Sequence, residues 1–397
     1  MKDDNAKLIR SNRVWLAEES CDLDEFKRIV ERTVDLADYP FASEAASNAL
    51  VYDGLEVRSA AASHEARKAL MAEWVEAFAD GPGIIAIRNA FADHKAIDAA
   101  NAHFWAIIEE ERLSNVGGGD HFAKPGANDR IWNALEKLCL RDPAVFAAYY
   151  GNPVGALVSE AWLGPSYQIT SQLNVVNPGG AAQVAHRDYH LGFQSPREIE
   201  RFPAHVHRLS PVLTLQGAVA HCDMPLETGP TLYLPFSQTY LSGYMATARP
   251  EFRAYFDKHH VQLPLAKGDA VFFNPALFHA AGTNRSKDVR RIANLLQVSS
   301  AFGRAMESVD RLEMSAKLYP ALKGMLNDRT ITAAEADNAI AACAEGYSFP
   351  TNLDRDPPIG GMAPKSQQDL MRQALKENWA AEAFSAGADA QAWRKLT

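Results

Sequence analysis

The middle third of the chain carries a series of short, β-prone segments with turn residues between them and no helical pattern separating them. The segments are residues 168–176, 212–220, 231–234, 270–273 and 292–298. The turns that bound them are Asn-Pro-Gly-Gly at 177–180, Glu-Thr-Gly-Pro at 227–230 and Lys-Gly-Asp at 267–269. A parallel sheet needs a helix between successive strands, so this pattern favours an antiparallel sandwich or barrel. We therefore expect a mainly β core.

Helical patterns lie on both sides of this β region. They are clearest at residues 66–78, 93–108, 333–344 and 367–384, and a short apolar strand is expected at 84–87. Residues 1 to about 80 are expected to be helical, and an Asp-Gly-Pro-Gly turn ends this part of the chain. The predicted parts are a helical N-terminal extension (1–73), a β-core domain (74–302) and a helical C-terminal extension packing on the core (303–397).

Composition excludes several classes of protein. The 397 residues include 40 Lys+Arg and 49 Asp+Glu, a net charge of −9, which argues against a general nucleic-acid binder because such proteins need a basic surface. No apolar run approaches the ~20 residues that span a bilayer, and the N-terminus lacks the apolar segment of a secretory signal. The four cysteines are far apart, without the spacing of a disulfide framework or a zinc site. We expect a cytoplasmic enzyme that acts on a small molecule, without nucleic-acid or membrane partners. Self-association into a homo-oligomer stays open.

Two stretches contain residues that could bind a metal ion. In His186-Arg187-Asp188 the first and third side chains point the same way if the segment is extended, so they can share one ion. His279 follows a second β-prone segment. Two imidazoles and one carboxylate form the facial triad of non-haem Fe(II) oxygenases, which leaves coordination positions open for a co-substrate and oxygen. A His-x-Asp pair alone is a weak signal, because about one is expected by chance in a chain with 12 histidines.

The order and spacing of several blocks resemble the phytanoyl-CoA dioxygenase-like members of the Fe(II)/2-oxoglutarate-dependent oxygenases. The blocks lie within about residues 74 to 300: Glu73-Trp74, the strand at 84–85, the turn at 177–180, His186-Arg187-Asp188, residues 218–223, 229–231 and 235–237, residues 267–273, and the stretch from His279 to Ser286 with Arg290-Arg291. The resemblance implies a double-stranded β-helix (jelly-roll, cupin-like) core. The chain departs from many relatives at 235–238, where Pro-Phe-Ser-Gln replaces Pro-Gly-Ser-His, and its last hundred residues exceed the family's usual extent. It ends without Ser-Lys-Leu, which argues against the peroxisomal member's role.

The resemblance implies that His186, Asp188 and His279 bind Fe(II), and that 2-oxoglutarate and O2 are the co-substrates. Arg290 is similar to the arginine that pairs with the distal carboxylate of 2-oxoglutarate, a task that suits the fork of a guanidinium. Arg291 competes for this role, because neighbouring strand residues face opposite sides and the sequence does not fix the register.

Further residues are candidates for binding the co-substrate and the substrate. Gln172 and Asn174 alternate along one segment and resemble positions that hydrogen-bond the co-substrate, although ladder-side polar residues or a water site would give the same pattern. Residues 193–210 are expected to be a loop over the mouth of the barrel, and the glycine-rich stretch 117–121 a second loop near it. The predicted substrate-binding residues are Tyr189, His190, Phe193, Arg197 and Arg201. The arginines favour an anionic metabolite, whereas a solvated loop face would also carry them.

The reaction implied by the resemblance is hydroxylation of a substrate C–H bond, with conversion of 2-oxoglutarate to succinate and CO2. A carboxylate at Asp188 favours hydroxylation over halogenation, because a halogenase of this superfamily needs a small residue there to admit halide. Two alternatives use the same ligands: a cupin-like metal-binding protein without oxygenase turnover, and a zinc-dependent hydrolase. Neither needs a cation about the length of a dicarboxylate from the metal, so Arg290-Arg291 favours the oxygenase.

Overall fold

The computed structural model describes residue 7 and residues 10–114 and 126–396. The chain forms two compact units, and each is assembled from separate stretches. The first unit contains Met1–Ala92, Gly119–Asp129 and Asn174–Ala293, and the second contains Asp93–Gly118, Arg130–Leu173 and Asn294–Thr397. The predicted glycine-rich loop at 117–121 lies outside the described residues. The boundaries expected at 73 and 302 stay predictions.

The strands form one eight-stranded sheet and one three-stranded sheet. In spatial order the larger sheet contains β1 (Glu44–Ala46), β2 (Ala49–Asp53), β3 (Ile84–Arg88), β9 (Ala270–Phe273), β6 (Thr214–Ala220), β11 (Arg291–Ser299), β5 (Gln168–Val176) and β4 (Asn128–Ile131). The smaller sheet contains β10 (Phe278–Ala280), β7 (Leu232–Leu234) and β8 (Val261–Gln262). The larger sheet is mixed, because β2 runs parallel to β3 while β3 and β6 both pair antiparallel with β9.

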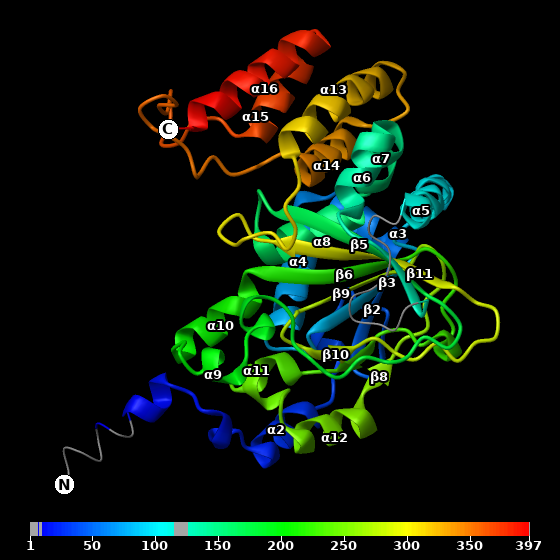
Figure 1. Ribbon diagram of the computed structural model, residues 1–397, viewed down its shortest axis with the longest axis vertical. Helices are drawn as coiled ribbons and strands as arrows, with labels where there is room; N and C mark the ends of the chain where they lie inside the picture. Colours follow the sequence, from blue (N-terminus) through cyan, green and yellow to red (C-terminus); the bar gives the residue numbers. More distant parts are fainter. Residues whose placement is uncertain (1–6, 8–9, 115–125, 397) are drawn as a thin grey trace. The chain divides into compact units, whose positions relative to one another are not determined.

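In the first unit, strands β2, β3 and β9 of the larger sheet pack face to face against the smaller sheet. Val51, Ala86 and Val271 of the larger sheet share one buried cluster with Tyr233 of β7 and with Leu277, which immediately precedes β10. Figure 1 shows β10 and β8 lying along β9 and β2 in this unit. Burying the inner faces of two sheets against each other gives the two-layer core of a jelly roll. The predicted mainly β, jelly-roll core with flanking helices is confirmed.

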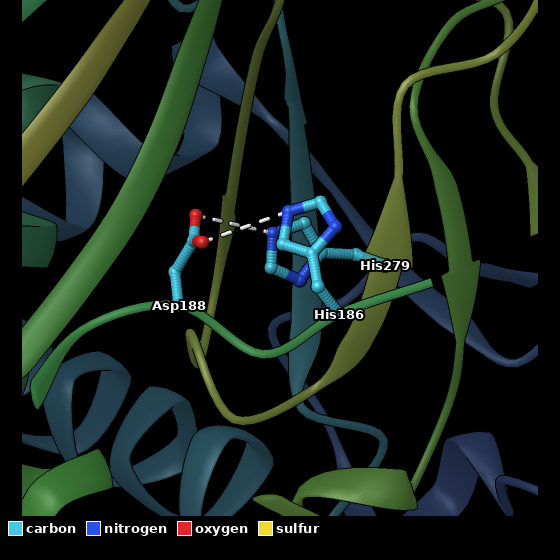
Figure 2. Close-up of side chains that lie close together, drawn as sticks. All are labelled: His186, Asp188 and His279. Carbon is cyan, nitrogen blue, oxygen red and sulfur yellow. Dashed lines mark ion pairs between the residues drawn. The ribbon is translucent and has the colours of Figure 1, made fainter. Parts of the chain in front are cut away.

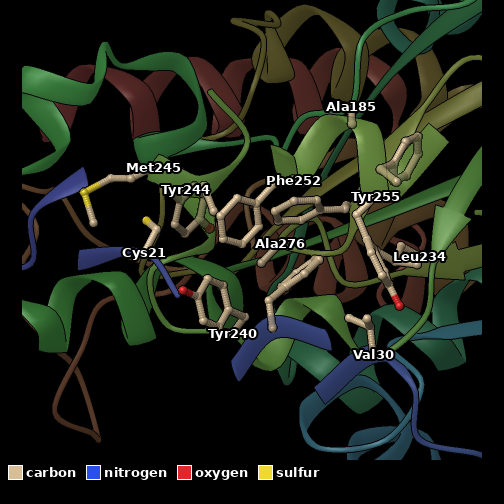
Figure 3. Close-up of a cluster of buried hydrophobic side chains, with 14 of the residues drawn as sticks. Cys21, Val30, Ala185, Leu234, Tyr240, Tyr244, Met245, Phe252, Tyr255 and Ala276 are labelled. Carbon is tan, nitrogen blue, oxygen red and sulfur yellow. The ribbon is translucent and has the colours of Figure 1, made fainter. Parts of the chain in front are cut away.

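A second buried cluster covers the outer side of β10 (Figure 3). It joins α2 (Leu23–Val30), α11 (Gly243–Ala246) and α12 (Pro250–His259) to the strand. Phe26 of α2 lies at its centre, with ring centroids 5.1 Å from Phe252 and 5.0 Å from Phe278. Burial of such rings stabilises the fold by roughly 1.5–3 kcal/mol each. The cluster therefore supports β10 from behind.

The second unit holds most of the remaining helices. They are α5 (Lys95–Ser114), α6 (Ala134–Arg141), α7 (Pro143–Tyr150), α8 (Pro153–Leu163), α13 (Arg311–Asn327), α14 (Ala333–Cys343), α15 (Gln367–Lys376) and α16 (Ala381–Lys395). Helix α13 packs against α6, α7, α14 and α16, and it buries Met314, Leu318 and Tyr319 (Figure 1). None of the helices in the described part of the chain is long and apolar enough to cross a membrane.

Several local predictions are wrong. Residues 1 to about 80 are not wholly helical. Strands β1 and β2 lie between α2 and the helices α3 (Gly54–Ala61) and α4 (His64–Ala79), because the apolar residues 49–52 are buried in the sheet. Residues 193–210, expected to be a loop, contain α9 (Pro196–Ile199) and most of α10 (Ala204–Val212). The second helix delays the start of β6 from 212 to 214.

Two features of the chain explain these differences. Helix α9 begins with a capping box, in which Ser195 and Glu198 satisfy each other's backbone N–H groups, and Pro196 occupies the first turn. The single helix expected at 367–384 is divided into α15 and α16, with Asn378 between them in a left-handed conformation (φ 56°). The turn at 80–83, by contrast, ends α4 as predicted.

Candidate metal centre

His186, Asp188 and His279 lie together in the first unit (Figure 2). His186 pairs with His279 of β10 through two backbone hydrogen bonds, with N–O distances of 3.0 and 3.2 Å. One ligand atom from each of the three side chains lies within 4.8 Å of the others. The Nε2 atoms of His186 and His279 are 3.6 and 3.5 Å from the Asp188 carboxylate oxygens. The structure thus brings together the three residues predicted to bind iron.

The protonation of both imidazoles is set by the main chain. Nδ1 of His186 is 2.8 Å from the carbonyl oxygen of Val184, and Nδ1 of His279 is 2.8 Å from that of Leu277. A carbonyl only accepts hydrogen bonds, so each Nδ1 carries the hydrogen and each Nε2 carries a lone pair. Both lone pairs lie on the side of Asp188. This is the tautomer that a metal ligand needs.

Asp188 is held in its charged form. Burial alone would raise the pKa of this carboxyl, but its contacts with His279, His186 and Gln216 outweigh burial and lower the pKa. Burial, reinforced by His279, lowers the pKa of His186. Neutral imidazoles and an ionised carboxylate are the forms that coordinate a metal. The donor set therefore fits a non-haem Fe(II) site.

Gln216 of β6 contacts Asp188, and the sequence did not predict this contact. Its Nε2 donates a hydrogen bond to Oδ2 of Asp188, which orients the carboxylate. The signal was present, because Gln216 is the one amide in the otherwise apolar or small β6 segment TLQGAVA. A polar side chain buried in such a strand requires a partner.

Arg187 anchors the stretch between the two ligands. It is buried, and its Nη2 donates to the carbonyl oxygens of Ser237 and Tyr240. The guanidinium also lies over the ring of Tyr244, 5.0 Å from its centroid. A Cβ at Gly243 would lie 2.0 Å from the guanidinium carbon, so this position has room only for glycine. Arg187 is thus fixed on the opposite side of the chain from its two neighbours.

The two candidate arginines occupy different environments. Arg290 is 43% exposed in its side chain, and it pairs with Asp129 at 3.2 Å and with Asn177 at 3.1 Å. Arg291, the first residue of β11, is 6% exposed. Its Nη1 lies 3.4 Å from the carbonyl oxygen of Thr228, and burial lowers its pKa to about 10. Arg291 and Tyr233 also influence each other's pKa, and Tyr233 is the cross-strand partner of His279.

Gln172 and Asn174 are both buried on β5. In the second unit, Oε1 of Gln172 accepts a hydrogen bond from Arg130 at 3.3 Å. In the first unit, Oδ1 of Asn174 is buried without a hydrogen-bond partner among the described residues. A role of either amide in binding the co-substrate stays a prediction.

The predicted substrate-binding residues follow Asp188 directly. Tyr189 is buried, and its ring centroid is 6.4 Å from that of Phe193, which is 54% exposed. His190 is partly buried, whereas Arg197 and Arg201 are exposed on and after α9. Their roles in substrate binding also stay predictions.

Comparisons with known proteins agree with this geometry. The family model described as Phytanoyl-CoA dioxygenase (PhyH) matches residues 65–292, which include all three metal-ligand candidates. A search of curated proteins finds no match.

Among solved structures, the chain is similar to the non-heme alpha ketoglutarate dependent epimerase SnoN from nogalamycin biosynthesis (17% identity, TM-score 0.41, covering 59% of this chain and 82% of SnoN). It is also similar to the carbocyclase SnoK of the same biosynthesis (19% identity, TM-score 0.43, covering 59% of this chain and 86% of SnoK).

Proposed function

Because the chain belongs to the phytanoyl-CoA dioxygenase family, we propose that it hydroxylates a C–H bond of a small organic metabolite. The matched region spans more than half of the chain and contains the three metal-ligand candidates. The protein is a non-haem iron enzyme that depends on 2-oxoglutarate, with Fe(II), 2-oxoglutarate and O2 as its cofactors. The observation that carries the proposal is the cluster of His186, Asp188 and His279.

Each side chain of this cluster has a defined task in the proposed reaction. His186, Asp188 and His279 would hold the iron and leave the remaining coordination positions to 2-oxoglutarate and oxygen. The bound iron and co-substrate supply the oxidising chemistry, in which 2-oxoglutarate becomes succinate and CO2. Gln216 keeps the Asp188 carboxylate oriented. A carboxylate ligand at 188 supports hydroxylation over halogenation, since it occupies the position that a halide would need.

We assign the distal carboxylate of 2-oxoglutarate to Arg291 rather than to Arg290. Arg290 already has a carboxylate partner, Asp129, on the surface. Arg291 is a buried cation with which no carboxylate pairs among the residues that the structure describes, and its Nη1 donates only a long hydrogen bond, of 3.4 Å, to the carbonyl oxygen of Thr228. A buried charge is costly unless an anion and hydrogen bonds compensate it. A dicarboxylate would supply both in bidentate geometry.

The test separates the cofactors from the outcome of the reaction. Anaerobic addition of Fe(II) and 2-oxoglutarate should give the weak visible metal-to-ligand charge-transfer band of a chelated complex. Candidate metabolites are then tested in air for stimulation of succinate release, with product mass measured under 18O2. Hydroxylation predicts a product with one added oxygen atom that comes from 18O2. Substrate-dependent succinate with a product that gains no oxygen would overturn hydroxylation, and absence of both band and succinate would overturn the enzyme assignment.

A further inference from the structure

A hydrogen-bonded chain of three side chains lies beside the metal ligands in the first unit. The hydroxyl of Tyr244 on α11 donates to Oγ of Ser210 on α10, at 3.1 Å. Oγ of Ser210 lies 3.0 Å from Nδ1 of His190. Ser210 and Tyr244 are both almost fully buried. The chain therefore runs from a buried phenol to an imidazole that is partly exposed.

The direction of these hydrogen bonds fixes the tautomer of His190. Ser210 has one hydroxyl hydrogen, and Tyr244 is the donor in the hydrogen bond between the two hydroxyl groups. Among the described residues, Nδ1 of His190 is the acceptor that remains for the Ser210 hydrogen, which would otherwise be buried without a partner. Nδ1 is therefore the acceptor, and the ring hydrogen resides on Nε2. This is the reverse of His186 and His279, whose Nδ1 atoms donate to carbonyl oxygens.

His190 is held close to the metal centre. It lies two residues after Asp188, so their Cα atoms are within about 7 Å of each other. At the other end of the hydrogen-bond chain, the ring centroid of Tyr244 lies 5.0 Å from the guanidinium carbon of Arg187, the residue before Asp188. Both ends of the hydrogen-bond chain thus lie next to the stretch that carries His186 and Asp188.

The backbone that positions His190 beside Asp188 is strained. Tyr189 and His190 both have positive φ angles, 64° and 43°, which non-glycine residues rarely adopt. The strain is held by a 2.7 Å hydrogen bond from Gly192 N to the carbonyl oxygen of Tyr189. A Cβ at Gly192 would lie 2.1 Å from the Arg187 carbonyl oxygen, so the turn requires glycine. Strained residues that the surroundings hold in place are typical of ligand-binding positions.

We propose that His190 binds the substrate by donating its Nε2–H hydrogen bond to an oxygen atom near the C–H bond to be oxidised. Ser210 and Tyr244 are positioning residues that keep the hydrogen on Nε2. Among the described residues, Nε2 of His190 has no hydrogen-bond partner, and the ring is partly exposed. The inference rests on the proposed hydroxylase and adds a substrate class: a metabolite with a carbonyl, hydroxyl or carboxylate oxygen beside the reacting carbon.

The tautomer can be measured without turnover. Long-range 15N–1H correlation spectra of the Zn(II)-substituted, 15N-histidine-labelled protein report which nitrogen of each imidazole carries hydrogen, and the signal absent in His190→Gln is that of His190. We expect the Nε2–H form in the wild type, a shift towards the other form in Ser210→Ala, and a smaller shift in Tyr244→Phe. His205→Ala, an exposed histidine on the same helix α10, is the matched control and should leave the signal unchanged. An Nδ1–H form in the wild type overturns the inference.

Binding is tested with pairs of compounds that differ by one carbonyl or hydroxyl oxygen, each measured by succinate release. For the oxygen-bearing member, His190→Ala should raise KM about fivefold, and His190→Gln, whose amide can donate, should recover most of this loss. For the oxygen-free member, the wild type and His190→Ala should have the same KM. An unchanged KM, or an equal loss for both members, overturns the inference.

The two proposals fail differently. If wild-type His190 carries hydrogen on Nδ1 while succinate release is normal, the inference fails and the hydroxylase stands. If no compound releases succinate and no charge-transfer band forms, the hydroxylase fails, and the inference falls with it whatever the tautomer.

Discussion

The stretch with the first two metal ligands, residues 185–188, and the segment that follows it, residues 189–212, are neighbours in the chain but are held by different means. In the first, main-chain groups set the tautomers of the histidine ligands: His186 is bridged to His279, and both Nδ1 atoms donate to carbonyl oxygens. The second is fixed by side chains, through the Tyr244–Ser210–His190 hydrogen bonds and the capping box of α9. Main-chain carbonyls are present whatever the sequence, whereas hydroxyl partners depend on it.

The two segments have different proposed tasks: the first binds the metal, and the second contacts the substrate. The metal-binding tautomers of His186 and His279 need only the correct backbone. The donor tautomer of His190 needs two specific hydroxyls. The segment also exposes four large apolar side chains: Phe193, Phe202, Leu209 and Val212.

The largest expected effect tests this separation directly. His186→Ala or His279→Ala removes one of the three ligands, so we expect loss of stoichiometric iron, measured as metal content after anaerobic reconstitution and desalting. His190→Ala, in the adjacent segment, should retain iron. Loss of iron from His190→Ala at wild-type stability would show that the two regions do not have separate tasks.

The next effect concerns the two neighbouring arginines. Arg291→Gln should weaken 2-oxoglutarate binding by about 30-fold or more, because the loss of a buried charge–charge contact costs about 2–5 kcal/mol. Arg290→Gln should change it by less than about twofold, since an exposed pair contributes little. The charge-transfer band, titrated with 2-oxoglutarate at saturating Fe(II), measures both. The reverse order would return the role to Arg290.

The sequence predicted the site where it depends on local geometry. His186 and Asp188 follow from the two-residue repeat of an extended segment, and His279 from the family's spacing. The choice between Arg290 and Arg291 depends on where β11 begins. Adjacent residues of a strand face opposite sides, so an error of one position exchanges the two arginines. The contact between Ser210 and His190 could not be predicted for another reason. Helix α10 brings Ser210 to His190, and a segment expected to be a loop gives no helical register from which to infer this.

A smaller effect comes from the packing behind the ligand stretch. Gly243→Ala would place a Cβ against the Arg187 guanidinium, which is buried and cannot move away freely. We expect a loss of about 1–3 kcal/mol in the free energy of unfolding, from urea denaturation. Gly155→Ala on α8 is the matched control: nothing lies within 4 Å of its added Cβ, so it should be neutral or stabilising by up to about 1 kcal/mol. Equal stability of the two variants would mean that Arg187 is not fixed by this contact.

The smallest effect concerns Arg197 and Arg201, the exposed arginines of the second segment. If they only attract an anionic metabolite from solution, the double alanine variant should raise KM about twofold at low salt, and the difference should vanish at about 0.5 M salt, where exposed charges are screened. Arg28→Ala on α2, which removes an equally exposed charge, is the control. An effect that persists in high salt would mean direct contact with an anionic group of the substrate. No effect at any salt concentration would mean that Arg197 and Arg201 take no part in binding the substrate.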